Sequence, residues 1–328
     1  MITRDDVARH AGVSKSTVSR VLNKNGYVSQ ENRTKIEKAI VDLGYAPNLI
    51  ARSLKTRESR QILFYTHEIL NPFYMEVYRG IEDYAGENGY TIVLSRHFDY
   101  SIVKQRQYDG IILSGVSTEM EREFINLGIP VVVTHYGGKP LNLPSVGIDI
   151  KGGAQKATQY LLKCGHRKIA FITINEKCDE QRLDGFLNCL KNTDIDIKST
   201  SIVCSKEKSH GYSQGYSCTM ELLSKSRDFT AVFAFNDTMA IGALSAFYEK
   251  GIKVPQDISI IGFDDIIQAS YTYPLLTTVK LPKYEQGYES ARLLISLIQG
   301  NRAESMTLDT QLVIRNSVLN KISLSHSL

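Results

Sequence analysis

The chain has 328 residues, more than the roughly 250 to 300 at which one hydrophobic core stops growing, so we expect more than one folded unit. Hydrophobic residues make up 42% and charged residues 23%, and no apolar run approaches the ~18 residues of a membrane span, which excludes a membrane-embedded protein. Residues 1–6 lack the layout of a signal peptide, so we expect a cytoplasmic protein with no membrane partner. Five cysteines without a Cys-x-x-Cys pair argue against disulfides and zinc, and we expect neither a metal nor a cofactor.

The net charge of +4 conceals an asymmetry along the chain. Residues 1–60 carry twelve Lys and Arg against six Asp and Glu, whereas the rest of the chain carries 27 against 29. Positive charge is therefore concentrated near the N-terminus, where we expect a polyanion such as nucleic acid to bind.

The first 45 residues predict three short helices. Thr3 is placed to cap a helix that Gly12 ends, and Ser14 at once offers the cap of a second helix. A third helix begins after Ser29 and ends at Gly44. Two short helices joined by a tight turn and followed by a third are typical of a helix-turn-helix head, although any small three-helix module shares this outline.

The second predicted helix has two unlike faces. Val18, Val21 and Leu22 recur at the spacing of one helical face and predict its buried side. The opposite face carries only hydrogen-bonding side chains, namely Lys15, Ser16, Ser19, Arg20 and Asn23. In a recognition helix, Lys15, Ser16 and Arg20 would reach base edges in the major groove, where Arg and Lys suit guanine O6 and N7.

Residues 45–55 extend this pattern. They predict a helix too short to be stable alone in water, with Leu54 exposed among basic neighbours. The constrained positions are Asp6-Val7-Ala8, Ala11-Gly12-Val13-Ser14, Thr17-Val18-Ser19-Arg20-Val21-Leu22-Asn23, Val28-Ser29, Tyr45, Pro47-Asn48, Ala51 and Leu54. This pattern resembles the lactose-repressor (LacI/GalR) family of bacterial transcriptional regulators.

The resemblance implies a role in DNA binding for each matching position. It divides the region into a helix-turn-helix domain at 1–45 and a hinge helix with linker at 46–58. Base-reading positions are Lys15, Ser16 and Arg20. Phosphate contacts are Ser14, Thr17, Ser19, Asn23 and Ser29. In the hinge, Asn48, Ala51 and Leu54 would enter the minor groove, where an apolar wedge such as Leu54 separates base steps.

From residue 59 to the end, the sequence predicts an α/β core. Short apolar runs alternate with helical segments, as the buried strands of doubly wound parallel sheets do. These runs lie at 62–65, 91–94, 110–113, 130–134, 168–174, 230–234 and 258–263. These strand and helix repeats are more than one such sheet usually needs, so we expect two lobes.

Polar residues follow several predicted strands, at the edge where open α/β sheets bind ligands. Asn71 follows the first strand, with the apolar Phe73 close behind it, Asn236 and Asp237 follow a later one, and Asp264 follows the last. Carboxylates and amides suit a polyhydroxyl ligand, but Asn and Asp at such positions equally serve as helix caps.

The family resemblance continues to about residue 317 through several motifs. They are Asn71-Pro72-Phe73, Tyr108-Asp109-Gly110-Ile111-Ile112, Gly165-His166-Arg167-Lys168-Ile169-Ala170, Arg182-x-x-Gly185-Phe186, Asn236-Asp237-x-Met239-Ala240-x-Gly242-Ala243, Ile261-Gly262-Phe263-Asp264-Asp265 and Pro274-Leu275-Leu276-Thr277-Thr278. The resemblance implies a two-lobed core like a periplasmic binding protein, with an N-lobe at about 59–163 and 282–310 and a C-lobe at about 164–281 and 311–320. The implied effector-binding residues are Phe73, Arg182, Asn236, Asp237, Asp264, Asn71 and His210, with Tyr212 as an alternative to His210.

Two features depart from the family pattern. The segment 95–108 is shorter than usual, so we expect the second helix of the N-lobe to be a stub or remodelled. The chain also has no Trp to stack on a sugar ring. Only eleven residues follow Ser317, without a leucine heptad, so we expect a homodimer that reads a palindromic operator rather than a tetramer.

We interpret the chain as a sequence-specific transcriptional regulator, a repressor of carbohydrate-utilisation genes controlled by a sugar-type effector bound between the lobes. Effector binding would either release DNA or promote its binding. A nucleotide-dependent enzyme is disfavoured because the chain lacks Gly-x-Gly-x-x-Gly and Gly-x-x-x-x-Gly-Lys loops. His166 has no nucleophile or metal ligand beside it in the sequence, and we expect it to be structural. A sugar transport receptor would need an export signal and no DNA-binding head.

Overall fold

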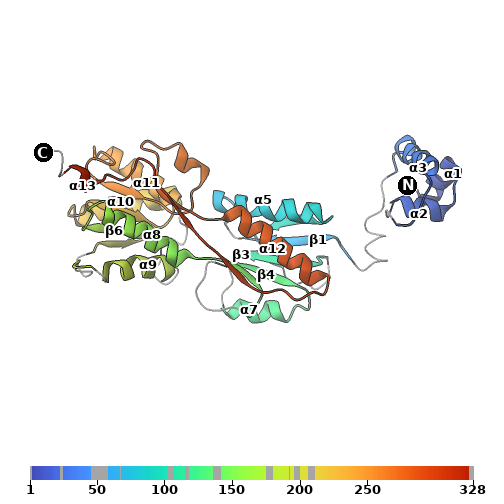
Figure 1. Cartoon of the computed structure of the whole chain (residues 1–328), viewed down its shortest axis with the longest axis horizontal. Coiled ribbons are helices and arrows are strands. Elements are labelled where there is room, and N and C mark those ends of the chain that lie inside the picture. Colours follow the sequence, from blue (N-terminus) through green and yellow to red (C-terminus); the bar gives the residue numbers. More distant parts are fainter. Residues whose placement is uncertain are drawn as a thin grey trace. The chain divides into compact units, whose positions relative to one another are not determined.

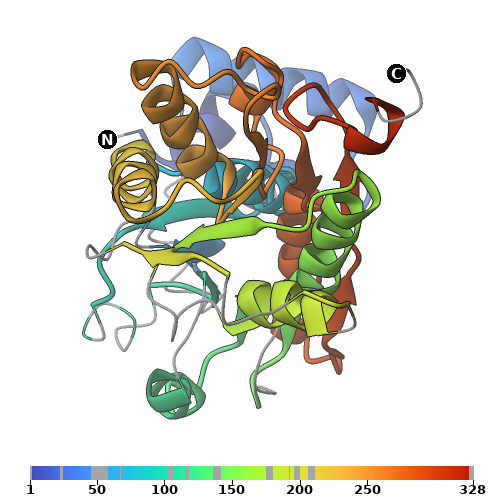
Figure 2. The ribbon, with the colours of Figure 1, turned by 90° about the vertical axis from the view of Figure 1, so that its left-hand side faces the viewer.

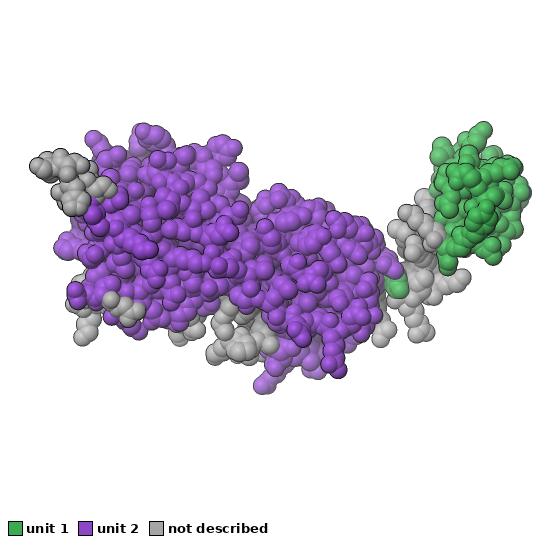
Figure 3. All heavy atoms as spheres, in the orientation of Figure 1, with its two compact units in different colours: residues 1–59 green, residues 60–328 purple. Residues whose placement is uncertain are grey.

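The computed structural model describes residues 2–22, 25–45, 58–66, 68–99, 101, 103, 107–114, 118–135, 142–174, 180–191, 193–195, 200–205 and 211–324. The chain divides into two compact units, Met1–Ser59 and Arg60–Leu328 (Figure 3). The predicted hinge at 46–58 lies outside the described residues except for Glu58. Within the described part of the chain, no helix is long and apolar enough to cross a membrane.

The described residues of the first unit form the helices α1 (Arg4–Ala11), α2 (Lys15–Leu22) and α3 (Gln30–Leu43) (Figure 1). The predicted cap of α1 is a capping box, in which Thr3 Oγ1 accepts from the Asp6 amide at 3.3 Å and Asp6 Oδ2 accepts from the Thr3 amide at 2.9 Å. Gly12 and Gly44 end α1 and α3 with left-handed φ values of 67° and 57°. The small core centres on Val7, Val18 and Ile36, which are completely buried.

The first lobe of the second unit is built on a parallel sheet with the strand order β11-β5-β4-β3-β1-β2. Its strands are β1 (Gln61–Tyr65), β2 (Thr91–Ser95), β3 (Gly110–Ser114), β4 (Val131–His135), β5 (Ser145–Ile148) and β11 (Met306–Leu308). Helices α5 (Pro72–Glu87) and α12 (Lys283–Ile298) pack side by side on one face (Figure 1). Alternate strand residues explain this layering: Phe64 and Ile112 face those helices, whereas Leu63 and Ile111 join Phe124 of α7 (Thr118–Ile125) on the other face.

The second lobe has a parallel sheet with the strand order β7-β6-β8-β9. Its strands are β6 (Ile169–Thr173), β7 (Ile202–Cys204), β8 (Ala231–Ala234) and β9 (Ser259–Ile261). Helices α8 (Ile150–Lys163) and α9 (Glu180–Lys191) cover one face, and α10 (Tyr212–Lys225) and α11 (Asp237–Glu249) cover the other (Figure 2). Both sheets confirm the predicted doubly wound, two-lobed core.

The chain crosses between the lobes three times, each time within a few residues. The crossings run from β5 to α8, from β10 (Thr278–Lys280) to α12, and from β11 to β12 (Gln311–Val313). Strands β10 and β12 pair antiparallel beside the second sheet. Lys156 ties the first crossing to the third, because its Nζ lies 2.6 Å from Asp309 Oδ1 and donates to the Thr310 carbonyl at 2.6 Å.

The structure corrects one predicted lobe boundary and adds strands that the sequence pattern missed. Helix α8 was assigned to the N-lobe, which was predicted to run to residue 163, but α8 packs on α9, β10 and β12 of the second lobe. The first crossing therefore lies at Asp149, which caps α8. The missed strands are β5, β7, β10, β11 and β12, each only three or four residues long. The segment 95–108, which we expect to be a stub or remodelled, is described only in part, and there Phe98 packs edge-on against Tyr65 and Phe124.

Candidate DNA-binding face and effector site

The predicted base-reading residues lie together on the outer face of α2. Lys15, Ser16 and Arg20 are all exposed. Ser14 caps the helix, since its Oγ accepts from the Thr17 amide at 3.2 Å and lies 2.8 Å from Ser16 Oγ. The head therefore presents a polar surface at the start of α2, as a recognition helix requires.

Only some of the other predicted DNA contacts lie within the described residues. Ser29 caps α3 by accepting from the Asn32 amide at 3.4 Å, and Ser19 is half-buried. Asn23, Asn48, Ala51 and Leu54 lie outside the described residues. Tyr27, which the sequence pattern did not single out, is 88% exposed in the loop between α2 and α3.

In the core, two of the predicted effector-binding residues, Arg182 and Asp264, lie beside each other. Arg182 Nη2 lies 3.7 Å from Asp264 Oδ1, and the two side chains are only 11% and 6% exposed. The guanidinium also stacks on Phe235 and Phe263, 4.2 and 4.6 Å from the ring centres. Burial raises the pKa of Asp264 to about 6, although Arg182 and Lys283 pull it down.

Lys283 holds the backbone of the same loop, and sequence reasoning missed it. Its Nζ donates to the carbonyl of Asp264 and, at 2.8 Å, to that of Asp265. Both aspartates have positive φ values, 116° and 55°, which residues other than glycine rarely adopt. Lys283 is the first residue of α12 in the first lobe, so its ammonium joins that lobe to the loop that carries Asp264.

Asn236 and Asp237 follow β8 but serve chiefly to hold the site together. Asn236 caps α11 by accepting from the Met239 amide at 2.9 Å. Asp237 is completely buried and accepts from Thr278 Oγ1 at 2.6 Å and from the Ile266 amide at 2.9 Å. Burial and the charge of Asp264 raise the pKa of Asp237 well above its usual value. The prediction that Asp237 lines the cleft wall is therefore corrected, because both of its oxygens bind within the protein.

The remaining predicted effector residues lie at the start of α5 or outside the described chain. Asn71 caps α5, with Oδ1 accepting from the Phe73 amide at 3.0 Å. Phe73 is buried and contacts Tyr74 edge-on. His210 is not among the described residues, whereas Tyr212, the alternative, begins α10 and is 45% exposed.

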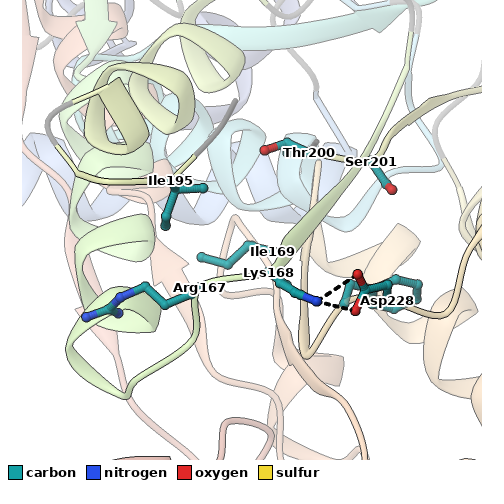
Figure 4. A pocket seen from close by; sticks show the side chains of 8 residues that line it. Arg167, Lys168, Ile169, Ile195, Thr200, Ser201 and Asp228 are labelled. Carbon is teal, nitrogen blue, oxygen red and sulfur yellow. Dashed lines mark hydrogen bonds and ion pairs between the residues drawn. The ribbon is translucent and has the colours of Figure 1, made fainter. Parts of the chain in front are cut away.

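A small hollow of about 150 Å³ lies away from this cluster (Figure 4). Arg167, Lys168, Ser201 and Asp228 line it at the amino ends of β6, β7 and β8. Lys168 and Asp228 already form an ion pair there, with Nζ 2.5 Å from Oδ1. Ligands of open α/β sheets bind at the opposite, carboxyl ends of strands, so we do not expect the effector in this hollow.

His166 and the cysteines among the described residues belong to the packing of the core. His166 is buried, with Nδ1 2.9 Å from Thr230 Oγ1 and Nε2 3.0 Å from the Leu319 carbonyl, and burial lowers its pKa. Cys164, Cys189 and Cys218 are buried free thiols, whereas Cys204 is half-buried. Among the described residues, no group of His, Cys, Asp and Glu side chains is arranged to hold a metal ion.

A helix-turn-helix unit joined to a two-lobed α/β core with a buried polar cluster at its strand ends defines a DNA-binding regulator with a sensor domain. Residues 3–48 match the model of bacterial regulatory proteins, lacI family, and residues 158–318 match a periplasmic binding protein-like domain. The chain belongs to the lacI family. It is a transcriptional regulator, like the family's other members, and not an enzyme.

Individual relatives agree with this assignment, two of them over 97% of the chain. The ribose operon repressor of Haemophilus influenzae is 33% identical and covers 97% of this chain and 99% of its own length. The lac repressor dimer bound to operator and the anti-inducer ONPF superposes with a TM-score of 0.83 at 27% identity, covering 97% of this chain and 99% of its own. A lacI-family regulator of Enterococcus faecium with bound ribose has a TM-score of 0.72 at 29% identity, covering 79% and 99%.

Proposed function

We propose that this regulator is a repressor whose operator affinity is set by a sugar-type effector at the strand ends of the core. The observation that carries the proposal is the buried pair of Arg182 and Asp264, 3.7 Å apart. Sugar hydroxyls accept from a guanidinium and donate to a carboxylate, so this pair matches a polyhydroxyl ligand. The ribose bound to the Enterococcus faecium relative supports the same ligand class.

A thermal-shift screen of the full chain tests the effector site. The probes are ribose, other mono- and disaccharides, sugar phosphates and purines. We expect a sugar to raise the melting temperature of the wild type, and we expect Arg182→Ala and Asp264→Ala to abolish that shift while operator affinity is kept. Arg167→Ala, at the hollow of Figure 4, is the matched control and should keep the shift. A shift that survives in both site variants would remove these residues from the site.

On the DNA side, we propose that Lys15, Ser16 and Arg20 read base edges of a palindromic operator in the cytoplasm. The exposure of all three on α2 supports this role. The proposed phosphate contacts are Ser14, Thr17, Ser19, Asn23 and Ser29, and the proposed minor-groove contacts are Asn48, Ala51 and Leu54. Selection of binding sites from random duplex DNA tests the proposal, and the absence of a salt-dependent preference for any palindrome would contradict it.

We further propose that a second copy of the chain covers an exposed apolar surface on the second lobe. Tyr248, Tyr273 and Leu275 line a hollow of about 960 Å³ there and are 88%, 100% and 40% exposed. Nearby in the sequence, Ile267 and Tyr271 are 65% and 80% exposed. Large exposed apolar groups that gather on one face are typical of interaction surfaces, and the lac repressor relative is a dimer.

A further inference from the structure

An acidic residue lies beside the proposed reading surface of the head. Asp5 of α1 forms an ion pair with Lys15, the first residue of α2, with Oδ2 2.8 Å from Nζ. The side chains of Asp5 and Lys15 are 54% and 64% exposed, so both groups of the pair reach solvent. Because Asp5 lies in α1 and Lys15 lies in α2, the ion pair joins the two helices.

The position of Asp5 is unfavourable for general DNA affinity. A carboxylate next to a phosphate-rich partner is repelled, and its pairing with Lys15 offsets a positive charge that would otherwise attract the DNA. Asp5 does contribute an acidic group to the first turn of α1, where negative charge favours the helix. However, Asp6 already supplies both an acidic group and the capping box there. Stability of α1 alone therefore does not account for an acid that contacts Lys15.

The geometry of the pair matches one base pair. In the major groove, guanine presents the O6 and N7 acceptors, and its partner cytosine presents the N4 donor, which binds Asp or Glu. O6 and N4 are themselves hydrogen-bonded, so they lie about 2.9 Å apart. The ammonium and carboxylate of the head lie 2.8 Å apart, which lets one donate to O6 while the other accepts from N4.

We propose that Asp5 is a specificity-determining residue of the DNA-binding head and that it reads one G·C pair in each half-site jointly with Lys15. This inference rests on the proposed reading role of Lys15. Asp5 lowers the affinity for all DNA through its charge and restores affinity only where a cytosine amino group is in reach. The pair thus lowers the affinity for DNA in general and increases the preference for sites with a G·C pair at this position.

Base-preference profiles from random-duplex selection with the full chain test the proposal. The variants are Asp5→Asn, Lys15→Met and the double variant, each measured also on a non-operator duplex. For Asp5→Asn we expect tighter binding to the non-operator duplex and a loss of at least about fivefold in discrimination at one G·C position of each half-site. In the Lys15→Met background, Asp5→Asn should cause no further loss at that position, because the two side chains act on one base pair.

The matched control is Glu31→Gln. Glu31 is paired with Lys35 at the same distance, 2.8 Å, within α3, so this variant removes an equal charge from the same unit. Its profile should keep the wild-type preference at every position. An Asp5→Asn profile identical to that of the wild type, with all affinities changed by one factor, would overturn the proposal. Failure of the underlying reading role is distinguishable, because Lys15→Met would then also leave the profile unchanged.

Discussion

Asp264 combines burial, charge and an unusual backbone conformation in one residue. Its side chain lies beside Arg182, its φ is 116°, and its carbonyl accepts from Lys283. These contacts come from α9 and α12, which belong to different lobes. Asp264 therefore contacts charged groups of both lobes, Arg182 through its carboxylate and Lys283 through its carbonyl.

Effector affinity should depend on pH through this residue. Because burial raises the pKa of Asp264 to about 6, the carboxylate loses its charge as the pH falls through that value. The neutral form attracts Arg182 less and accepts more weakly from sugar hydroxyls, so we expect weaker binding of the sugar from the screen below about pH 6. Calorimetric titration from about pH 5 to about pH 8 measures the effect.

The same shift has the opposite sign for folding. A carboxyl whose pKa is raised on folding stabilises the folded state most at low pH. This contribution is lost as the pH rises from 3.8, the usual pKa of the group, to about 6, its pKa in the folded protein.

The control for the pH dependence of sugar binding is Asp228→Asn, which removes an exposed carboxylate at the hollow of Figure 4 and should keep that pH dependence. Sugar affinity that stays constant across this range would contradict the role of Asp264.

Individual site residues were predictable to different extents. Arg182 and Asp264 stood within motifs that the resemblance covered, and the structure brings them together. Asn236 fitted both a ligand contact and a cap, and it caps α11. Lys283 was not predictable, because a lysine at a helix start normally faces water. Only the tertiary fold brings it to carbonyl groups nearly twenty residues away.

At the scale of elements, two glycines set the packing of α5 against α12. A Cβ atom at Gly80 would overlap the carbonyl oxygen of Tyr284, and one at Gly287 would overlap that of Val77. The two helix backbones therefore approach each other so closely that only glycine, which has no Cβ atom, fits at these two positions. This contact also positions the start of α12, where Lys283 lies.

Gly80→Ala should destabilise the protein because the helices must move apart to admit a methyl group. We expect a loss of roughly 1 to 3 kcal/mol in the free energy of unfolding, measured by urea denaturation of the full chain. Gly86→Ala is the control on the same helix. No atom other than those of the local helix backbone lies within 4 Å of a Cβ there, and alanine favours a helix over glycine by up to about 1 kcal/mol, so stability should be kept or increased. Equal losses in both variants would contradict the close packing.

Elements were predicted well where local chemistry marks them. Thr3, Ser14 and Ser29 cap helices as expected, because capping depends on residues next to one another in sequence. The strands β7 and β10 were missed because three residues are too few to show a period. The lobe assignment of α8 was wrong for another reason: a helix between two lobes carries an apolar stripe whichever lobe it packs on.

At the scale of the whole molecule, the exposed apolar surface on the second lobe is the feature that predicts assembly. Tyr273→Asp places a charge at a residue that is 100% exposed, so the fold should be unaffected while the proposed contact between copies is lost. We expect a monomer in analytical ultracentrifugation and operator affinity reduced by about a hundredfold or more, because one head replaces two.

Ile125→Asp, on α7 of the first lobe, is the control for that surface. Its side chain is 49% exposed and lies outside the proposed contact, so the variant should remain a dimer. A Tyr273→Asp protein that still sediments as a dimer would place the contact between copies elsewhere.

The three crossings between the lobes also constrain how the gene can change. Each lobe is assembled from separated stretches of coding sequence, since β11 and α12 of the first lobe are encoded after nearly all of the second. No single stop codon or gene fusion boundary can therefore release one lobe intact. A truncation before Lys283 would remove α12 from one lobe and β12 from the other at once. The sensor is inherited as a whole, whereas the head, confined to the first 59 residues, can be exchanged by one recombination event.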